Sequence, residues 1–163
     1  MVRLFIVVLA VAGAATPPQV TIDRVLSRVN GEIITQSDVR QAQLLKLFGA
    51  RAEGPAGDTA VLRELENRRL ILAEVARAGL PEPTPDRRAS RRREWEATLG
   101  GQSQVARLLE RGGMSETAID DWCRNDLRIE AYLAERFKAY APQERTRAIA
   151  SWVDELRRRA GLK

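Results

Sequence analysis

The chain has 163 residues, of which 30% are charged, and its 27 Lys and Arg against 22 Asp and Glu give a formal net charge of +5 at pH 7. It contains no histidine and a single cysteine, which excludes Ser-His-Asp and Cys-His catalytic sites, an internal disulfide and a plausible zinc site. We therefore expect no catalytic residues, no cofactor and no bound metal, and a fold that is held together by packing.

Residues 1–15 predict a secretion signal. One positive residue, Arg3, precedes an apolar run that begins at Leu4 and ends in small residues. The run is roughly 12 residues long, whereas a membrane-spanning helix needs about 20. We expect cleavage near Ala14 or Ala15 and a mature protein outside the cytoplasm, with an uncleaved membrane anchor as the alternative. The remainder predicts one domain over 20–163.

A β-hairpin is predicted next. An imperfectly alternating run over 20–29 is followed by Asn30-Gly31, the pair that favours the two positive φ angles of a type I′ turn, and then by a second strand over 32–35. Asn30 and Gly31 are therefore expected to be structural. Since an isolated hairpin is only marginally stable in water, it must lie against helices. The apolar residues expected to cover helix surface are Ile22, Val25, Val29, Ile33 and Ile34.

Helical patterns fill the rest of the chain. A capping-box pattern at Thr35 and Asp38 starts a helix whose apolar stripe is Val39, Ala42, Leu45 and Phe48. After a Gly-rich loop over 49–58, a long helix over 58–78 is apolar nearly all round near Leu70, which indicates a central element. A Pro-rich linker over 81–86 and Gly pairs separate the remaining predicted helices, 87–99, 102–111, 115–140 and 143–161. The fold class is mainly α, with about six helices.

The last predicted helix, 143–161, has a clean amphipathic face that includes Trp152. We expect it to pack back on the helices over 58–79 and 115–140, with Trp122 and Trp152 as structural residues. Cys123 lies on a helical pattern and is expected to be buried as a small hydrophobe, with intermolecular pairing as the alternative.

Arginines concentrate in RRASRRR, 87–93. In a cytosolic protein such a cluster would favour a nucleic-acid partner, but behind a secretion signal we expect none. An anionic lipid surface or an acidic partner fits that compartment better, and a solvated basic helix face is the alternative. The candidate anionic-surface patch is Arg87, Arg88, Arg91, Arg92 and Arg93.

The ordered set of segments resembles the N-terminal chaperone domain of SurA and related parvulin-type periplasmic proteins. The segments that carry the resemblance are IDRVLSRVNGEIITQSDV (22–39), LRELENRRLILAEVARAGL (62–80), TPDRRASRRREWEATLG (84–100) and GGMSETAIDDWCRNDLRIEAYLAERF (112–137). The resemblance covers nearly all of the mature chain, and it rests on the order of the segments rather than on one motif.

The C-terminal segment departs from that family. AIASWVDELRRRAGLK, 148–163, resembles the segment that follows the parvulin isomerase module, yet only about ten residues separate this helix from Phe137, and a parvulin domain needs on the order of a hundred. The paired histidines of parvulin sites are also absent. The resemblance therefore implies a periplasmic chaperone domain that lacks the isomerase module.

The function implied by the resemblance is non-catalytic binding of unfolded or outer-membrane client polypeptides. Apolar side chains on the two short helices, 87–99 and 102–111, are the candidate client-binding surface, with ordinary core packing as the alternative. These residues are Trp95, Leu99, Leu108 and Leu109. The alternative functions are a structural subunit of an envelope assembly and a protein that contacts anionic lipid peripherally, while a prolyl isomerase is the least expected.

Overall fold

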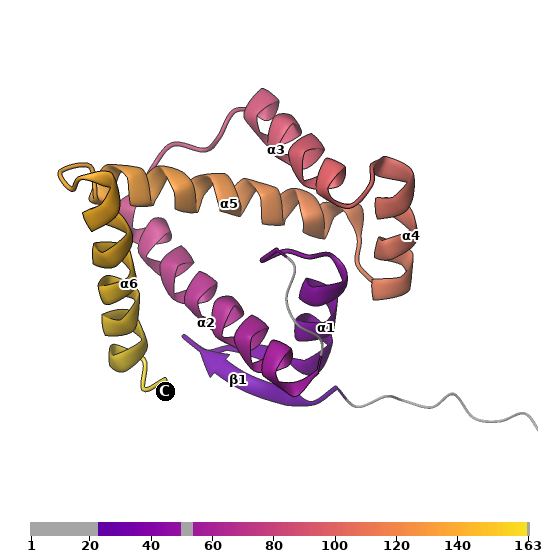
Figure 1. The fold of residues 1–163 in the computed structure, drawn as a ribbon, viewed down its shortest axis with the longest axis horizontal. Coiled ribbons are helices and arrows are strands. Elements are labelled where there is room, and N and C mark those ends of the chain that lie inside the picture. Colours follow the sequence, from indigo (N-terminus) through magenta and orange to yellow (C-terminus); the bar gives the residue numbers. More distant parts are fainter. Residues whose placement is uncertain (1–22, 50–53, 163) are drawn as a thin grey trace, which may run out of the picture.

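The structure, a computed structural model, describes residues 23–49 and 54–162. The predicted secretion signal and Ile22 lie outside the described residues. The described part is mainly helical with an N-terminal antiparallel hairpin, as predicted (Figure 1). Its elements are β1 (Val25–Val29), β2 (Glu32–Thr35), α1 (Gln36–Leu44), α2 (Pro55–Ala78), α3 (Pro85–Thr98), α4 (Gln102–Gly112), α5 (Glu116–Arg136) and α6 (Pro142–Arg159). Within this part, no helix combines the length and the apolar character that crossing a membrane requires.

The hairpin turns at Asn30 and Gly31 as predicted, with φ angles of 51° and 88°. Val29 and Ile34 are fully buried, whereas Val25 and Ile33 remain 55% and 44% exposed. The expectation that all the apolar residues of the hairpin cover helix surface was therefore wrong for Val25 and Ile33. Ile33 and Ile34 are successive residues of β2 and therefore point to opposite faces, whereas in β1 the register shift between Val25 and Ser27 interrupts the alternation that would otherwise place Val25 on the buried face with Val29.

Helix α1 begins with the predicted capping box, in which the Asp38 amide donates to Thr35 Oγ1 and the Thr35 amide donates to Asp38 Oδ2 at 2.8 Å. It ends at Leu44, earlier than the apolar stripe suggested, and Lys46 has a φ of 48°. Because the chain turns here, Leu45 and Phe48 leave the helical stripe and reach different neighbours. Leu45 is fully buried, and the Phe48 ring meets the Trp122 ring edge-on with centroids 5.3 Å apart.

Helix α2 is the central element, as predicted. It contacts both strands, α1, α5 and α6, and Figure 1 shows it crossing the middle of the molecule. It begins at Pro55, three residues before the predicted start, because Pro is well accommodated in the first turn of a helix. It ends at Ala78, and Gly79 follows as its cap in the left-handed conformation, with a φ of 62°.

Helix α6 packs back on α2 and on the end of α5, as predicted, and Figure 1 shows it alongside α2. Trp152 is 7% exposed, and its ring lies 5.7 Å from the Phe137 ring and 5.9 Å from the Tyr132 ring, centroid to centroid. Farther along α6, buried Arg157 donates to Glu66 Oε2 at 2.9 Å, and Ser27 donates to Glu66 Oε1 at 2.6 Å. This network joins β1, α2 and α6.

Two hydrophobic clusters form the interior. The first joins the hairpin, α1, α2, α6 and the C-terminal half of α5. The second joins Leu45, the end of α3, α4 and the N-terminal half of α5. Leu47 packs against both clusters. Helix α5 therefore contributes residues to both clusters. The boundary between the clusters, which we call the seam, lies between the two halves of α5.

Candidate functional site

A groove of about 270 Å³ lies along this seam, where β2, α1, α2 and α5 meet, and we call it the seam groove. Its lining is mostly apolar, and several of its side chains are only partly buried. The apolar lining includes Ala42, Leu47, Leu65, Leu72, Met114 and Trp122. Leu72 is distinctive among them, because it is half-buried and packs in neither hydrophobic cluster of the described residues.

Arg68 supports the groove from α2. Its guanidinium carbon lies 3.7 Å from the centroid of the Trp122 ring, and Nη2 donates to the carbonyl oxygen of Trp122 at 2.8 Å. Nη1 donates to Asp126 Oδ1 at 3.0 Å. Burial lowers the pKa of Arg68 from its usual value, and the Asp126 carboxylate opposes that effect. An arginine pKa starts so high that the side chain stays protonated, so Asp126 is its necessary counter-charge.

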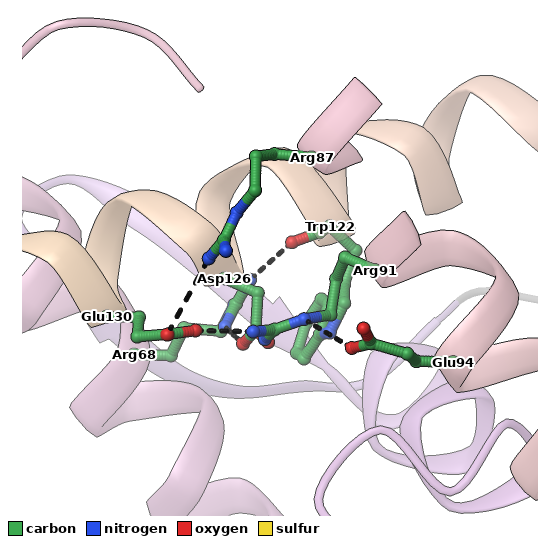
Figure 2. Close-up of polar contacts among 7 residues, drawn as sticks. All are labelled: Arg68, Arg87, Arg91, Glu94, Trp122, Asp126 and Glu130. Atoms are coloured by element: carbon green, nitrogen blue, oxygen red, sulfur yellow. Dashed lines mark hydrogen bonds and ion pairs between the residues drawn. The ribbon is translucent and has the colours of Figure 1, made fainter. Parts of the chain in front are cut away.

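Asp126 also pairs with Arg91, so it links Arg68 of α2 to α3 (Figure 2). Arg91 donates through Nη1 to Asp126 and through Nη2 to Glu130, and its Nε lies 3.4 Å from a carboxylate oxygen of Glu94. Arg87 reaches Glu130 more loosely, at 3.9 Å. The network therefore ties α2, α5 and α3 together behind the groove, with charges of opposite sign placed alternately.

Arg92 makes a second connection between α3 and α5. Its guanidinium donates to Glu96 at 2.6 Å, to Asp120 at 2.7 Å and also to Glu116. Burial by itself lowers the pKa of Arg92, but the hydrogen bonds to the three carboxylates outweigh it and raise the pKa above its usual value. The Arg92 side chain is only 17% exposed, so little of its charge faces solvent.

The candidate anionic-surface patch is therefore not a free cationic surface. Arg87, Arg91 and Arg92 pair with carboxylates of this same chain, because α3 lies against the acidic face of α5. Within the part that the structure describes, Arg88 and Arg93 have no carboxylate partner, and Arg93 donates to Ser90 Oγ at 3.0 Å. Of the five arginines, Arg88 and Arg93 are exposed without a carboxylate partner in the described part of the chain, and Arg87 is 65% exposed but lies 3.9 Å from Glu130.

The candidate client-binding residues also do not form an open surface. Leu99, Leu108 and Leu109 are buried in the second hydrophobic cluster, with exposed fractions of 8% or less. Trp95 is half-buried against that cluster, and its Nε1 donates to the carbonyl oxygen of Leu45 at 3.2 Å. The structure thus shows ordinary core packing, because α3 and α4 cover each other and the first half of α5.

Cys123 is 2% exposed in the second cluster, as expected for a small hydrophobe. Burial raises the pKa of its thiol, so the reactive thiolate is disfavoured. Over residues 23–49 and 54–162, no group of three or more His, Cys, Asp and Glu side chains could hold a metal ion.

Two ion pairs flank the seam groove. Glu32 Oε2 lies 3.3 Å from Arg69 Nη1, and Asp121 Oδ1 lies 3.3 Å from Arg124 Nη2. In each pair the carboxylate is the more exposed partner, at 73% for Glu32 against 25% for Arg69 and 57% for Asp121 against 37% for Arg124. The polar rim of the groove therefore turns its negative groups toward solvent.

Sequence reasoning had not identified the groove residues. The three consecutive apolar residues Leu70–Leu72 did indicate such a site, because a helix that is apolar on nearly all sides can keep one apolar face that no other element of the chain covers. Met114 and Leu47 carried no such signal, since both lie in connections whose path depends on tertiary packing. Trp122, which was expected to be only structural, also lines the groove.

The chain was compared with protein-family models, curated proteins and solved structures, and none of them matches it.

Proposed function

We propose that the mature chain is a non-catalytic, chaperone-like protein that binds extended segments of unfolded or outer-membrane polypeptides outside the cytoplasm. The seam groove is the observation that carries this proposal. A concave site with apolar walls and a few polar groups is the usual form of a binding site. At about 270 Å³ the groove falls just below the range of about 300–1,000 Å³ that is typical of small-molecule sites. It suits one or two apolar side chains of a polypeptide.

The polar groups around the groove favour apolar capture over fixed chemistry. Arg68 is held by Asp126 and by the Trp122 carbonyl, and Asp38 is held by the capping box. Side chains that already have partners inside the chain need not be desolvated anew by a client. The main contribution to affinity should then come from apolar surface, at about 25 cal/mol for each Å² removed from water.

The compartment and the class of client in this proposal are inferred from the sequence. Residues 1–15 have the pattern of a secretion signal, and the order of the segments resembles the chaperone domain of a periplasmic family. Docking on an anionic surface is the weaker alternative, because Arg87, Arg91 and Arg92 are paired inside the chain.

A binding titration tests the proposal. The mature chain from Thr16 would be titrated with an unfolded outer-membrane β-barrel protein at low and high salt, and aggregation of that protein would be followed by light scattering. We expect binding in the micromolar range that largely survives high salt, together with delayed aggregation. Absence of binding at both salt concentrations would refute the proposal.

Two variants locate the binding site. Leu72→Gln replaces a half-buried groove residue that packs in neither cluster, so we expect the fold to survive and the affinity to fall by about tenfold. Val25→Gln is the matched control, because Val25 is a 55% exposed apolar residue outside the groove lining. Equal losses of affinity in both variants would show that binding does not depend on the groove.

A further inference from the structure

The ion pairs at the rim of the seam groove share an arrangement that the apolar lining does not explain. In the two ion pairs that flank the groove, the cation lies against the protein and the carboxylate faces solvent. Arg69 Nη1 donates to the Ile33 carbonyl oxygen at 2.7 Å in addition to pairing with Glu32, so its guanidinium is held at the edge of β2. Glu32 itself is 73% exposed.

Asp121 repeats this arrangement on α5, at another part of the rim. It pairs with Arg124 one turn along the same helix and remains 57% exposed. Asp38, a third carboxylate in the lining, is half-buried in the capping box of α1. The groove therefore presents exposed carboxylates beside an apolar floor, in a chain whose formal net charge is +5.

We propose that the seam groove selects client segments in which an apolar side chain is flanked by Lys or Arg. This inference rests on the proposed function and adds the charge of the client to it. The apolar side chain would occupy the space beside Leu72 and Trp122, and a neighbouring cation would approach Glu32 or Asp121. Each carboxylate has about four lone-pair sites, so it can accept a client cation without releasing its arginine.

The expected preference is moderate, because rim charges are screened and mainly affect specificity. At low salt we expect a segment with basic flanks to bind about tenfold more tightly than the same segment with acidic flanks. At high salt the two affinities should converge, since the Debye length shortens to about 3 Å at 1 M. The apolar contribution is not screened and should persist.

Three fluorescent peptides with one common Leu-rich centre and flanks of Lys, Ser or Glu would test this inference by fluorescence anisotropy. With the wild-type chain at low salt, we expect the affinity to fall in the order Lys, Ser, Glu. The double variant Glu32→Gln with Asp121→Asn should bind the three peptides within about twofold of one another.

Another double variant, Glu135→Gln with Glu155→Gln, is the matched control. It removes the same number of negative charges, and these carboxylates are 62% and 54% exposed and lie outside the groove lining. We expect it to keep the order Lys, Ser, Glu, because that order depends on charges at the rim of the groove. If it loses the order as fully as the rim variant does, the preference reflects overall charge and the inference is refuted.

The remaining outcomes separate this inference from the proposed function. Equal affinity of the wild-type chain for all three peptides would refute the charge preference and leave apolar capture standing, provided that Leu72→Gln weakens all three. Failure of the wild-type chain to bind any peptide, and to bind the unfolded outer-membrane protein, would refute the proposed function itself.

Discussion

Arg68 and Trp122 form a stacked pair at the seam of the molecule, with the guanidinium carbon 3.7 Å from the centroid of the indole ring and an Nη2 hydrogen bond of 2.8 Å to the backbone carbonyl of the same residue. A desolvated cation–π contact of this kind contributes about 2 kcal/mol. The planar guanidinium also donates to Asp126. One side chain of α2 therefore makes three contacts with α5: the stack on the Trp122 ring, the hydrogen bond to the Trp122 carbonyl and the hydrogen bond to Asp126. Only arginine combines these contacts.

The first prediction concerns this pair. Arg68→Lys should lower the free energy of unfolding by about 2–3 kcal/mol, because lysine keeps the charge but loses the fork of donors and the planar stack. Urea unfolding followed by circular dichroism would measure the loss.

Arg63→Lys is the matched control on the same helix. Arg63 and its partner Asp154 have side chains that are 52% and 62% exposed, and exposed pairs contribute about 0–1 kcal/mol. We expect the control to change stability by less than about 0.5 kcal/mol. Equal losses in the two variants would contradict the importance of the Arg68–Trp122 stack.

The second prediction concerns the docking of α6. Trp152→Ala should destabilise the fold by about 3–5 kcal/mol, because it opens a cavity beside the rings of Tyr132 and Phe137. Thermal and urea unfolding would both report the change. A loss below about 1 kcal/mol would mean that α6 is not docked in solution.

Trp152→Phe provides the matched comparison. The buried Nε1 of Trp152 has no hydrogen-bond partner among the described residues, so phenylalanine removes an unsatisfied donor while it keeps an aromatic ring. We expect a loss of no more than about 1.5 kcal/mol. A larger loss would indicate that the indole nitrogen has an important partner.

The third prediction separates two arginines of α3. Arg92→Ala should lower the free energy of unfolding by about 1.5–3 kcal/mol, because it leaves Glu96, whose side chain is only 15% exposed, without its cation. Arg88→Ala should change it by less than about 0.5 kcal/mol, since Arg88 is exposed and has no carboxylate partner in the described part of the chain. Urea unfolding of both variants would measure this contrast, and similar losses would contradict it.

The fourth prediction is a dependence of stability on pH. Hydrogen bonds from the side chains of Ser37 and Thr35 lower the pKa of Asp23 below its usual value of 3.8. The folded state therefore holds the carboxylate more firmly ionised than the unfolded state does. The resulting stability is present above about pH 4 and is lost as the pH falls through the lower folded-state pKa.

Asp23→Asn tests this dependence. We expect the variant to melt at a lower temperature than the wild type at about pH 6, and the two melting temperatures to converge toward about pH 3. Scanning calorimetry over that range would measure the difference. A difference that stays constant down to pH 3 would show that the ionised carboxylate is not responsible.

Local patterns in the sequence were enough to predict the elements of the fold. Asn30-Gly31 predicted the turn, and Thr35 and Asp38 predicted the start of α1. These features depend on residues that are close in the chain, so their physical chemistry can be read from a few neighbouring letters. The end of α1 was missed, because the chain leaves the helix at Leu44 to place Leu45 and Phe48 in different environments.

The sequence alone therefore determined the helical class, the hairpin, the central position of α2 and the amphipathic face of α6. Only the tertiary structure decided where the arginines of α3 direct their charge, and that Leu99, Leu108 and Leu109 are buried while Leu72 lines a groove. The reason is physical: periodicity shows which residues share a face of a helix, whereas exposure and pairing depend on which distant element covers that face.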